Sequence, residues 1–150
     1  MRYPTSKTVT ACVFSTVLAV APVMAEVTTP QPGTPERSDI LDSVRVMVGY
    51  DLGGPIEFTD VGIGIEDGFG FVTATATRPG GKPININQTP LVLRDEVPTD
   101  FIDGTTVQAF ITQADGNWYV HEYVVGATDV WWMGDPYCDD YAAFLPKQVC

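Results

Sequence analysis

Apolar side chains recur every three or four positions in the stretch that follows Thr34. The residues on this repeat are Ile40, Leu41, Val44, Met47 and Val48. Such spacing is typical of one face of an α-helix. Thr34 suits the N-cap, Pro35 the first helical position and Gly49 the end. The pattern predicts an amphipathic helix that starts at Pro35 and stops at Gly49, with one apolar face that another element must cover.

The next stretch changes to the period of two that is typical of β-strands. In "IEFTDVGIGIE", one side carries three aliphatic residues, Val61, Ile63 and Ile65. Asp67–Gly68 then supplies a turn, and "FGFVTATAT" returns as a second strand. Gly62 and Gly64 weaken the first strand unless backbone or an aromatic ring packs closely against them.

A second hairpin is predicted where "TTVQAFIT" and "WYVHEYVV" flank a turn at Asp115–Gly116. The face of its first strand opposite Phe110 carries Val107, Ala109 and Ile111. Both faces are therefore apolar, and we expect each to be covered in part. In the second strand, strict alternation puts His121 on the same face as Tyr119 and Tyr123.

Two segments follow neither period. The connection "RPGGKPININQTPLVLRDEVPTDFIDG" is rich in Pro, Gly and Asn. It is too long for a plain loop, so we expect it to be functional or to pack along an edge, and "PLVLR" within it to form a short extra strand. In the tail, "TDVWW" and "DPYCDDYAAF" each begin with a capping residue, and Pro136 suits a first helical position, which predicts short helical turns.

The predicted order is helix, strand, strand, long connection, strand, strand and tail. A helix packed on a curved antiparallel sheet of about four strands is the simplest way to bury these faces. The sequence therefore predicts an α+β fold with a cystatin-like or nuclear-transport-factor-like layout and an irregular C-terminal tail.

The first segment of the chain is typical of a signal peptide. Arg2 and Lys7 precede an apolar run, and Val23 and Ala25 fit the −3 and −1 positions of a signal peptidase site. Two alternatives stay open: lipoprotein-type cleavage at Cys12, and retention as an uncleaved anchor. The predicted division of the chain is a signal peptide at 1–25, a flexible linker at 26–34 and a single domain at 35–150. We expect a periplasmic or extracellular protein with no membrane span after cleavage.

The composition is strongly acidic, with 19 Asp and Glu against 8 Lys and Arg and a formal net charge of −11. A chain without a basic patch repels nucleic-acid phosphates and anionic lipid head groups. We expect no nucleic-acid partner. A partner protein or small ligand is expected to be neutral or cationic, although the simpler interpretation is that the charge keeps an exported protein in solution.

Two cysteines, Cys138 and Cys150, remain once the signal peptide is removed. In an oxidising compartment an even pair predicts a disulfide. The neighbouring acids Asp135, Asp139 and Asp140 disfavour the thiolate that a catalytic cysteine needs. We therefore expect a disulfide-linked tail with a structural role and no nucleophile there.

Certain strings resemble a group of small exported bacterial proteins of unassigned function. These are "PERSDILDSVR", "FGFVTATATRPGG" and "DGTTVQAFITQADGNWYVHEYVVGATDVWW". The resemblance covers residues 34 to 133, which leaves the cysteine-bearing tail outside it. It implies a shared family and transfers no catalytic residue.

The remaining candidate contacts for a ligand or partner are Arg78, Lys82, His121, Trp131 and Trp132. A catalytic histidine would need a nucleophile to activate, and the chain contains no "GxSxG" serine motif. A strand histidine without a catalytic role is therefore the simpler interpretation of His121. Trp131 and Trp132 could stack on a sugar or peptide, but adjacent side chains point apart, which favours packing.

The stretch "RPGGKP" combines two cations with consecutive glycines, whose amides could seat an anion. A plain turn that ends the second strand is the competing interpretation. One histidine and a disulfide cannot form a usual zinc site, and the tail acids lack the spacing of an EF-hand. We expect no metal and no cofactor.

The sequence favours an exported, non-enzymatic binding or accessory domain of the bacterial envelope, because no catalytic constellation is recognisable. One alternative is a small hydrolase or isomerase with a pocket in the concave sheet, in which His121 and an acid exchange protons. Another is an inhibitor of a partner envelope protein, with "RPGGKP" or the two tryptophans as its wedge.

Overall fold

The computed structural model describes residues 26–94, 97–133 and 137–150. The predicted signal peptide at 1–25 lies outside these residues, and so do Asp135 and Pro136. Within the described ranges, no helix is both long enough and apolar enough to cross a membrane.

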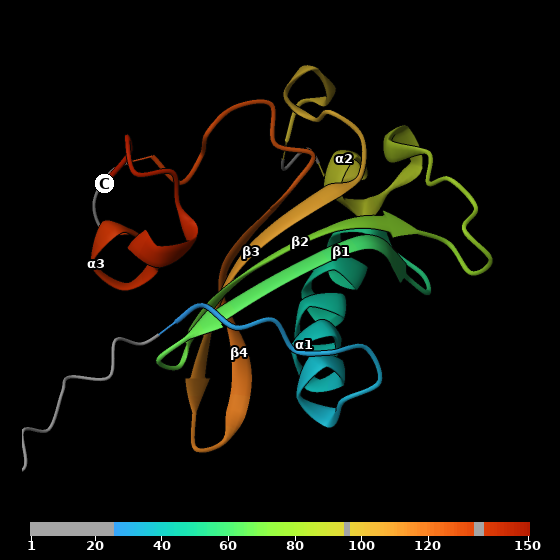
Figure 1. Cartoon of the computed structure of the whole chain (residues 1–150). Helices are drawn as coiled ribbons and strands as arrows, with labels where there is room; N and C mark the ends of the chain where they lie inside the picture. The colour runs from blue at the N-terminus through green and yellow to red at the C-terminus, as the bar shows by residue number, and fades with distance from the viewer. Residues whose placement is uncertain (1–25, 95–96, 134–136) are drawn as a thin grey trace, which may run out of the picture.

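One long helix packs against a four-stranded antiparallel sheet (Figure 1). The strands lie side by side in their sequence order. The main elements are α1 (Pro35–Leu52), β1 (Glu57–Glu66), β2 (Phe69–Thr77), β3 (Thr106–Ala114) and β4 (Asn117–Val125). Asp67 and Asp115 adopt positive φ at the two predicted hairpin turns. The predicted α+β class is confirmed.

Helix α1 starts as predicted and ends later than predicted. The Thr34 hydroxyl accepts a hydrogen bond from the Arg37 amide at 3.4 Å. Gly49 lies inside the helix, and the end is at Gly53, which has a φ of 68° and donates its N–H to the Gly49 carbonyl at 2.9 Å. The extra turn buries Leu52 completely, which outweighs the cost of about 1 kcal/mol for a helical glycine.

The face of the sheet toward α1 carries an aliphatic core. The helix contributes four fully buried residues, Ile40, Val44, Val48 and Leu52. The strands contribute Ile63, Val72, Val107, Ala109, Ile111 and Val125. The apolar face of α1 and the inward-facing residues of the strands thus pack together in one core, as the sequence predicts.

The opposite face of the sheet is covered by the C-terminal tail, drawn in red in Figure 1. Phe110 is fully buried there and packs with Tyr141 and Leu145. Further aromatic rings surround it: Phe69, Phe71, Trp131, Trp132, Tyr137 and Phe144. We call this group the tail cluster. The prediction that both faces are covered is confirmed.

The tail is closed by a disulfide. Its short helices are α3 (Tyr137–Tyr141) and a 3-10 turn at Ala142–Phe144. Cys138 and Cys150 are bonded, with Cα atoms 5.4 Å apart, which confirms the predicted pair. At 128–132, where helical turns are predicted, the chain forms bends and one hydrogen-bonded turn, in which the Met133 amide donates to the Val130 carbonyl at 3.1 Å, but no helix. Phe144 packs at Gly64, the aromatic contact that this strand glycine predicts.

Strand β4 contains a bulge at His121. The residues on either side of it pair with consecutive residues of β3, Glu122 with Phe110 and Val120 with Ile111. An unpaired residue shifts the alternation for everything that follows. The prediction that Tyr123 shares a face with His121 is therefore wrong: Tyr123 faces α1, while His121 lies near Tyr141 of the tail.

The connection from β2 to β3 contains a short helix, α2 (Pro90–Leu93). The strand predicted for "PLVLR" is wrong, because Thr89 and Pro90 start a helical turn in which the Leu93 amide donates to the Thr89 carbonyl at 3.0 Å. Leu91 is buried against the end of the core. The connection thus packs against one end of the core.

The lead-in before α1 is joined to β1. Thr28 and Ile65 exchange two backbone hydrogen bonds of 2.8 Å. Pro30 is buried, and its carbonyl accepts from the Arg37 guanidinium at 3.1 Å. The predicted linker at 26–34 therefore adds a short bridge to the outer edge of the sheet.

Candidate functional site

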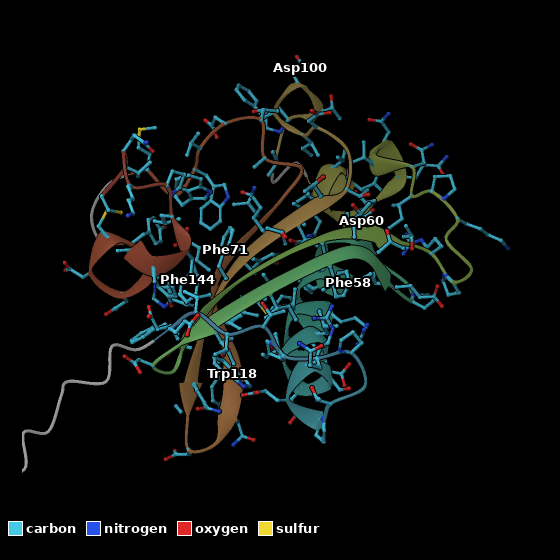
Figure 2. All side chains as sticks on the ribbon, viewed as in Figure 1. Phe58, Asp60, Phe71, Asp100, Trp118 and Phe144 are labelled. Atoms are coloured by element: carbon cyan, nitrogen blue, oxygen red, sulfur yellow. A yellow bond between two sulfur atoms is a disulfide. The ribbon has the colours of Figure 1, made fainter. Side chains whose placement is uncertain are left out.

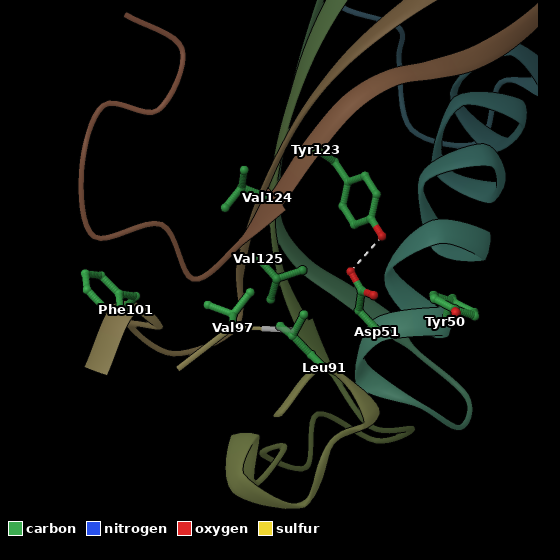
Figure 3. A pocket seen from close by; sticks show the side chains of 8 residues that line it. All are labelled: Tyr50, Asp51, Leu91, Val97, Phe101, Tyr123, Val124 and Val125. Carbon is green, nitrogen blue, oxygen red and sulfur yellow. Dashed lines mark hydrogen bonds between the residues drawn. The ribbon is translucent and has the colours of Figure 1, made fainter. Parts of the chain in front are cut away.

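A cavity of about 410 Å³ opens between the C-terminal end of α1, the end of β4 and the β2–β3 connection (Figure 3). Its apolar walls are Leu91, Val97, Phe101, Val124 and Val125. Its polar lining comes from Tyr50, Asp51 and Tyr123. We call it the Asp51 cavity. Its volume falls within the usual range for small-molecule sites, roughly 300–1,000 Å³.

The Asp51 carboxylate is the buried polar group of this cavity, with only 9% of the residue exposed. Its Oδ2 accepts a hydrogen bond of 2.6 Å from the Tyr123 hydroxyl, as the dashed line in Figure 3 marks. Its Oδ1 accepts one of 3.2 Å from the Arg94 guanidinium, which compensates its charge. Each carboxylate oxygen has a further lone pair with which it can accept from a ligand.

Asp51 stands at an unfavourable place for an acid. It lies in the last turn of α1, which contains no basic residue of its own. Burial of its charge has a cost. Arg94 offsets part of it and also stacks over the ring of Tyr50, at 4.2 Å from the centroid. Asp51 therefore has two dedicated side-chain partners, which come from segments distant in the sequence.

The bulge in β4 is what brings Tyr123 to this site. Without the extra residue at His121, Tyr123 would point to the tail side of the sheet. On the α1 side its hydroxyl lies 2.6 Å from Asp51 and 3.3 Å from the Met47 carbonyl. The phenol thus joins the edge strand to the end of the helix.

The cavity combines apolar walls with a buried carboxylate, that of Asp51, which accepts hydrogen bonds. Such a site suits a small, mainly apolar molecule that donates a hydrogen bond to Asp51. In the part of the chain that the structure describes, no group of three or more His, Cys, Asp or Glu is placed to hold a metal ion.

The predicted contact residue His121 lies away from this cavity. It is exposed on the tail side of the sheet, and its ring centroid is 5.9 Å from that of Tyr141. Its neighbour Glu122 accepts a hydrogen bond from the Tyr137 hydroxyl. The nearest partners of His121 therefore belong to the tail.

The two tryptophans both pack in the tail cluster, and both are half-buried. The indole N–H of Trp131 donates to the Gln108 side chain at 2.7 Å, and its ring lies 5.4 Å from that of Phe110. Trp132 joins the same cluster, so both rings hold the tail against the sheet.

Arg78 and Lys82 form the predicted turn at the end of β2 through a backbone bridge. The Arg78 guanidinium donates to the carbonyls of Leu52, at 2.8 Å, and Gly53, and so neutralises the negative end of α1. The predicted anion site at the glycine amides is occupied by an acid of the chain itself, because the Gly80 amide donates to the Glu57 carboxylate at 2.9 Å. Lys82 is exposed.

Two tyrosines of the tail have raised pKa values. A hydrogen bond to the Glu122 carboxylate, with burial and the charge of Glu122, raises the pKa of Tyr137 to about 12. Burial, with the charge of Asp140, raises the pKa of Tyr141 to about 12. Both phenols therefore stay protonated in the docked tail.

Sequence reasoning missed Asp51, Tyr123 and Arg94 as a group. One signal was present: Asp51 follows Val44 by seven positions and Val48 by three, so it lies on the apolar face of the helix. An acid on a buried helical face calls for a partner, but the partners come from distant segments that no local pattern identifies.

Comparison with known proteins gives no match, whether with protein-family models, curated proteins or solved structures. The resemblance to a group of small exported bacterial proteins stays a prediction.

Proposed function

We propose that this chain is an exported, non-enzymatic binding domain of the bacterial envelope, and that the Asp51 cavity holds its ligand. The ligand is a small, largely apolar molecule that carries one hydrogen-bond donor. The observation that carries the proposal is the Asp51–Tyr123 pair, a buried carboxylate and phenol in a cavity with apolar walls. The disulfide and the lack of a membrane-crossing helix in the described residues are compatible with export.

The chemistry of the cavity favours a neutral or cationic ligand. Asp51 offers only acceptors, and the net charge of −11 disfavours the approach of an anion. Two aromatic residues at the cavity, Tyr50 and Phe101, are each 65% exposed, so they present ring surface that a ligand can cover.

Three fragments with the same cyclohexane ring test this proposal by methyl NMR: cyclohexanol, cyclohexylamine and cyclohexanecarboxylate. We expect the alcohol and the amine to shift the methyl signals of Val124 and Val125. The carboxylate is expected to bind about tenfold or more weakly, because it brings no donor and repels Asp51. Asp51→Ala should remove this preference, and Asp39→Asn on the exposed face of α1 serves as the matched control. Equal binding of all three fragments would contradict the proposal.

The enzymatic alternative has one observation in its favour, since a carboxylate in an apolar cavity can act as a general base. Against it, the carboxylate already pairs with Arg94 and Tyr123, and His121 lies on the other side of the sheet. Turnover of a panel of esters, peptides and glycans by the pure protein decides the matter. Turnover that Asp51→Asn abolishes would make the cavity an active site.

A further inference from the structure

The Arg94 guanidinium compensates the buried charge of the Asp51 cavity. Arg94 directly follows α2, and its Nη2 atom lies 3.2 Å from Oδ1 of Asp51. The same guanidinium donates to the Tyr50 carbonyl at 3.2 Å and stacks over the Tyr50 ring. A carboxylate, a carbonyl and an aromatic ring therefore hold this one cation beside the acid.

Arg94 stands next to the cavity without forming its wall. Asp51 and Tyr123 line the cavity, and Arg94 is not among the described residues that do so. The Arg94 side chain is 31% exposed, against 12% for the side chain of Asp51. A ligand in the cavity therefore meets the carboxylate, and Arg94 affects that ligand through the charge that it places behind the carboxylate.

Asp51 and Arg94 together have no net charge, and this decides what the carboxylate can bind. A neutral donor needs only a free lone pair, which each carboxylate oxygen still has. An ammonium group loses strong hydration when it enters a site with apolar walls, and only a carboxylate whose charge is uncompensated offsets that loss. Arg94 already compensates Asp51, and it repels a second cation.

We propose that Arg94 sets the ligand class of the Asp51 cavity. The site selects a neutral molecule that donates a hydrogen bond over an ammonium with the same apolar body. Arg94 can select in this way only if the cavity holds a ligand, so this inference rests on the proposed function. It narrows the neutral or cationic class that the acceptors of Asp51 allow. Arg94 is thus a positioning residue, because it acts on the ligand through Asp51.

A purely structural role of Arg94 leads to a different expectation. If the ion pair only stabilised the end of α1, loss of Arg94 would weaken the binding of all ligands alike. If Arg94 sets the charge of the site, its loss leaves Asp51 buried and uncompensated. The carboxylate then favours a cation, and the order of the ligands reverses.

The test compares cyclohexanol with cyclohexylamine near neutral pH, where the amine is an ammonium. Each is titrated while the methyl signals of Val124 and Val125 are followed by NMR. We expect the wild-type protein to bind the alcohol about tenfold more tightly than the amine. Arg94→Gln removes the charge and keeps a donor for Asp51, and we expect it to bind the amine about tenfold more tightly than the alcohol.

Two further variants separate the charge of Arg94 from its packing. Arg94→Lys keeps the positive charge and loses the planar group that stacks on Tyr50. It should bind the alcohol more tightly, as the wild type does. The double substitution Arg94→Gln with Asp51→Asn removes both charges, so the preference for the amine should disappear again.

Arg45→Met is the matched control, because Arg45 has the same kinds of partner at another place on α1. These partners are the Asp42 carboxylate, the Phe58 ring at 5.3 Å and the Ile56 carbonyl. The substitution removes one positive charge from the protein, as Arg94→Gln does. The wild-type order of the two probes should remain.

Figure 2 shows how far this control lies from the cavity. Phe58, over which Arg45 stacks, lies near the middle of the view, and Asp100 lies at the top. Asp100 is the neighbour of Phe101, which lines the cavity. Arg45 therefore tests the effect of overall charge without contact with the Asp51 cavity.

The outcomes separate this inference from the proposed function. Equal binding of both probes by the wild type, or equal weakening of both in Arg94→Gln, would overturn the role of Arg94 and leave the binding domain in place. A reversal in Arg45→Met would also overturn it, because overall charge would then set the order. No methyl shift with either probe in any variant would refute both proposals. The wild-type comparison needs no substitution, so it decides even if Arg94→Gln does not fold.

Discussion

The two faces of the sheet are covered in different ways. The α1 face is aliphatic and is covered by a helix close in sequence to the first strands. The tail face is aromatic, and it is covered by the last part of the chain, which a disulfide closes. The first arrangement follows from local periodicity and needs no cross-link. The second depends on large rings and a covalent bond, because short helical turns have little stability of their own.

The largest expected effect on stability comes from deletion of His121, because it changes which β4 side chains lie on each face of the sheet. Removing the bulge residue shifts the alternation of β4, so Tyr123 and Val125 would leave the α1 face. We expect a loss of more than about 4 kcal/mol in the free energy of unfolding, measured by urea titration.

The matched control is His121→Ala, which keeps the bulge and removes only an exposed ring. It should change the free energy of unfolding by no more than about 0.5 kcal/mol. Similar stabilities of the deletion and the substitution would mean that the bulge does not set the faces of β4.

The next largest effect is expected from the double substitution Cys138→Ala with Cys150→Ala. Opening a loop of this length costs about 3 kcal/mol in the chain-entropy model. The loss should fall on the tail side, so hydrogen exchange at α3 should become fast while amides of α1 keep most of their protection. Equal loss of protection in both elements would show that the two faces unfold as one unit.

High pH is expected to separate the faces without any mutation. Tyr137 and Tyr141 have pKa values of about 12, against an ordinary value of 10.0. Their protonated forms are favoured in the folded protein, so their contribution is complete below pH 10 and is lost as the pH rises toward 12. The near-ultraviolet circular dichroism of the tail cluster should therefore decline in this pH range before the far-ultraviolet signal of the secondary structure does. Tyr137→Phe should reduce the pH dependence.

The smallest expected effect is that of Tyr123→Phe on the α1 face. It removes the contacts of the hydroxyl with Asp51 and with the Met47 carbonyl, and it leaves the Arg94 pair in place. We expect a loss of about 1 kcal/mol in the free energy of unfolding. Tyr119→Phe, at an exposed position of the same strand, is the matched control and should have no measurable effect. A larger loss in the control would contradict the assignment of Tyr123 to the buried site.

Most of the fold was predictable because its signals are local. The cap at Thr34, the Asp-Gly turns and the alternation of β3 each lie within a few residues. The disulfide followed from the two cysteines that remain once the predicted signal peptide is removed. The wrong predictions arose where distant contacts decide. Burial of Leu52 carries α1 past Gly49, the bulge reverses the face of Tyr123, and Pro90 starts a helix where an apolar run favoured a strand.

The candidate site was far less predictable than the fold. Asp51 is 43 positions from Arg94 and 72 positions from Tyr123 in the sequence. No spacing rule therefore connects the acid with its two partners.

The two ends of the described chain meet over one strand glycine. A side chain at Gly64 would contact Val27 of the lead-in at 3.1 Å and Phe144 of the tail at 3.2 Å. A carrier protein or a surface attached at the tail would therefore sit beside the lead-in that precedes α1. The Asp51 cavity takes no part in that junction, so a sensor immobilised through its carboxyl end would still present the cavity to the solution.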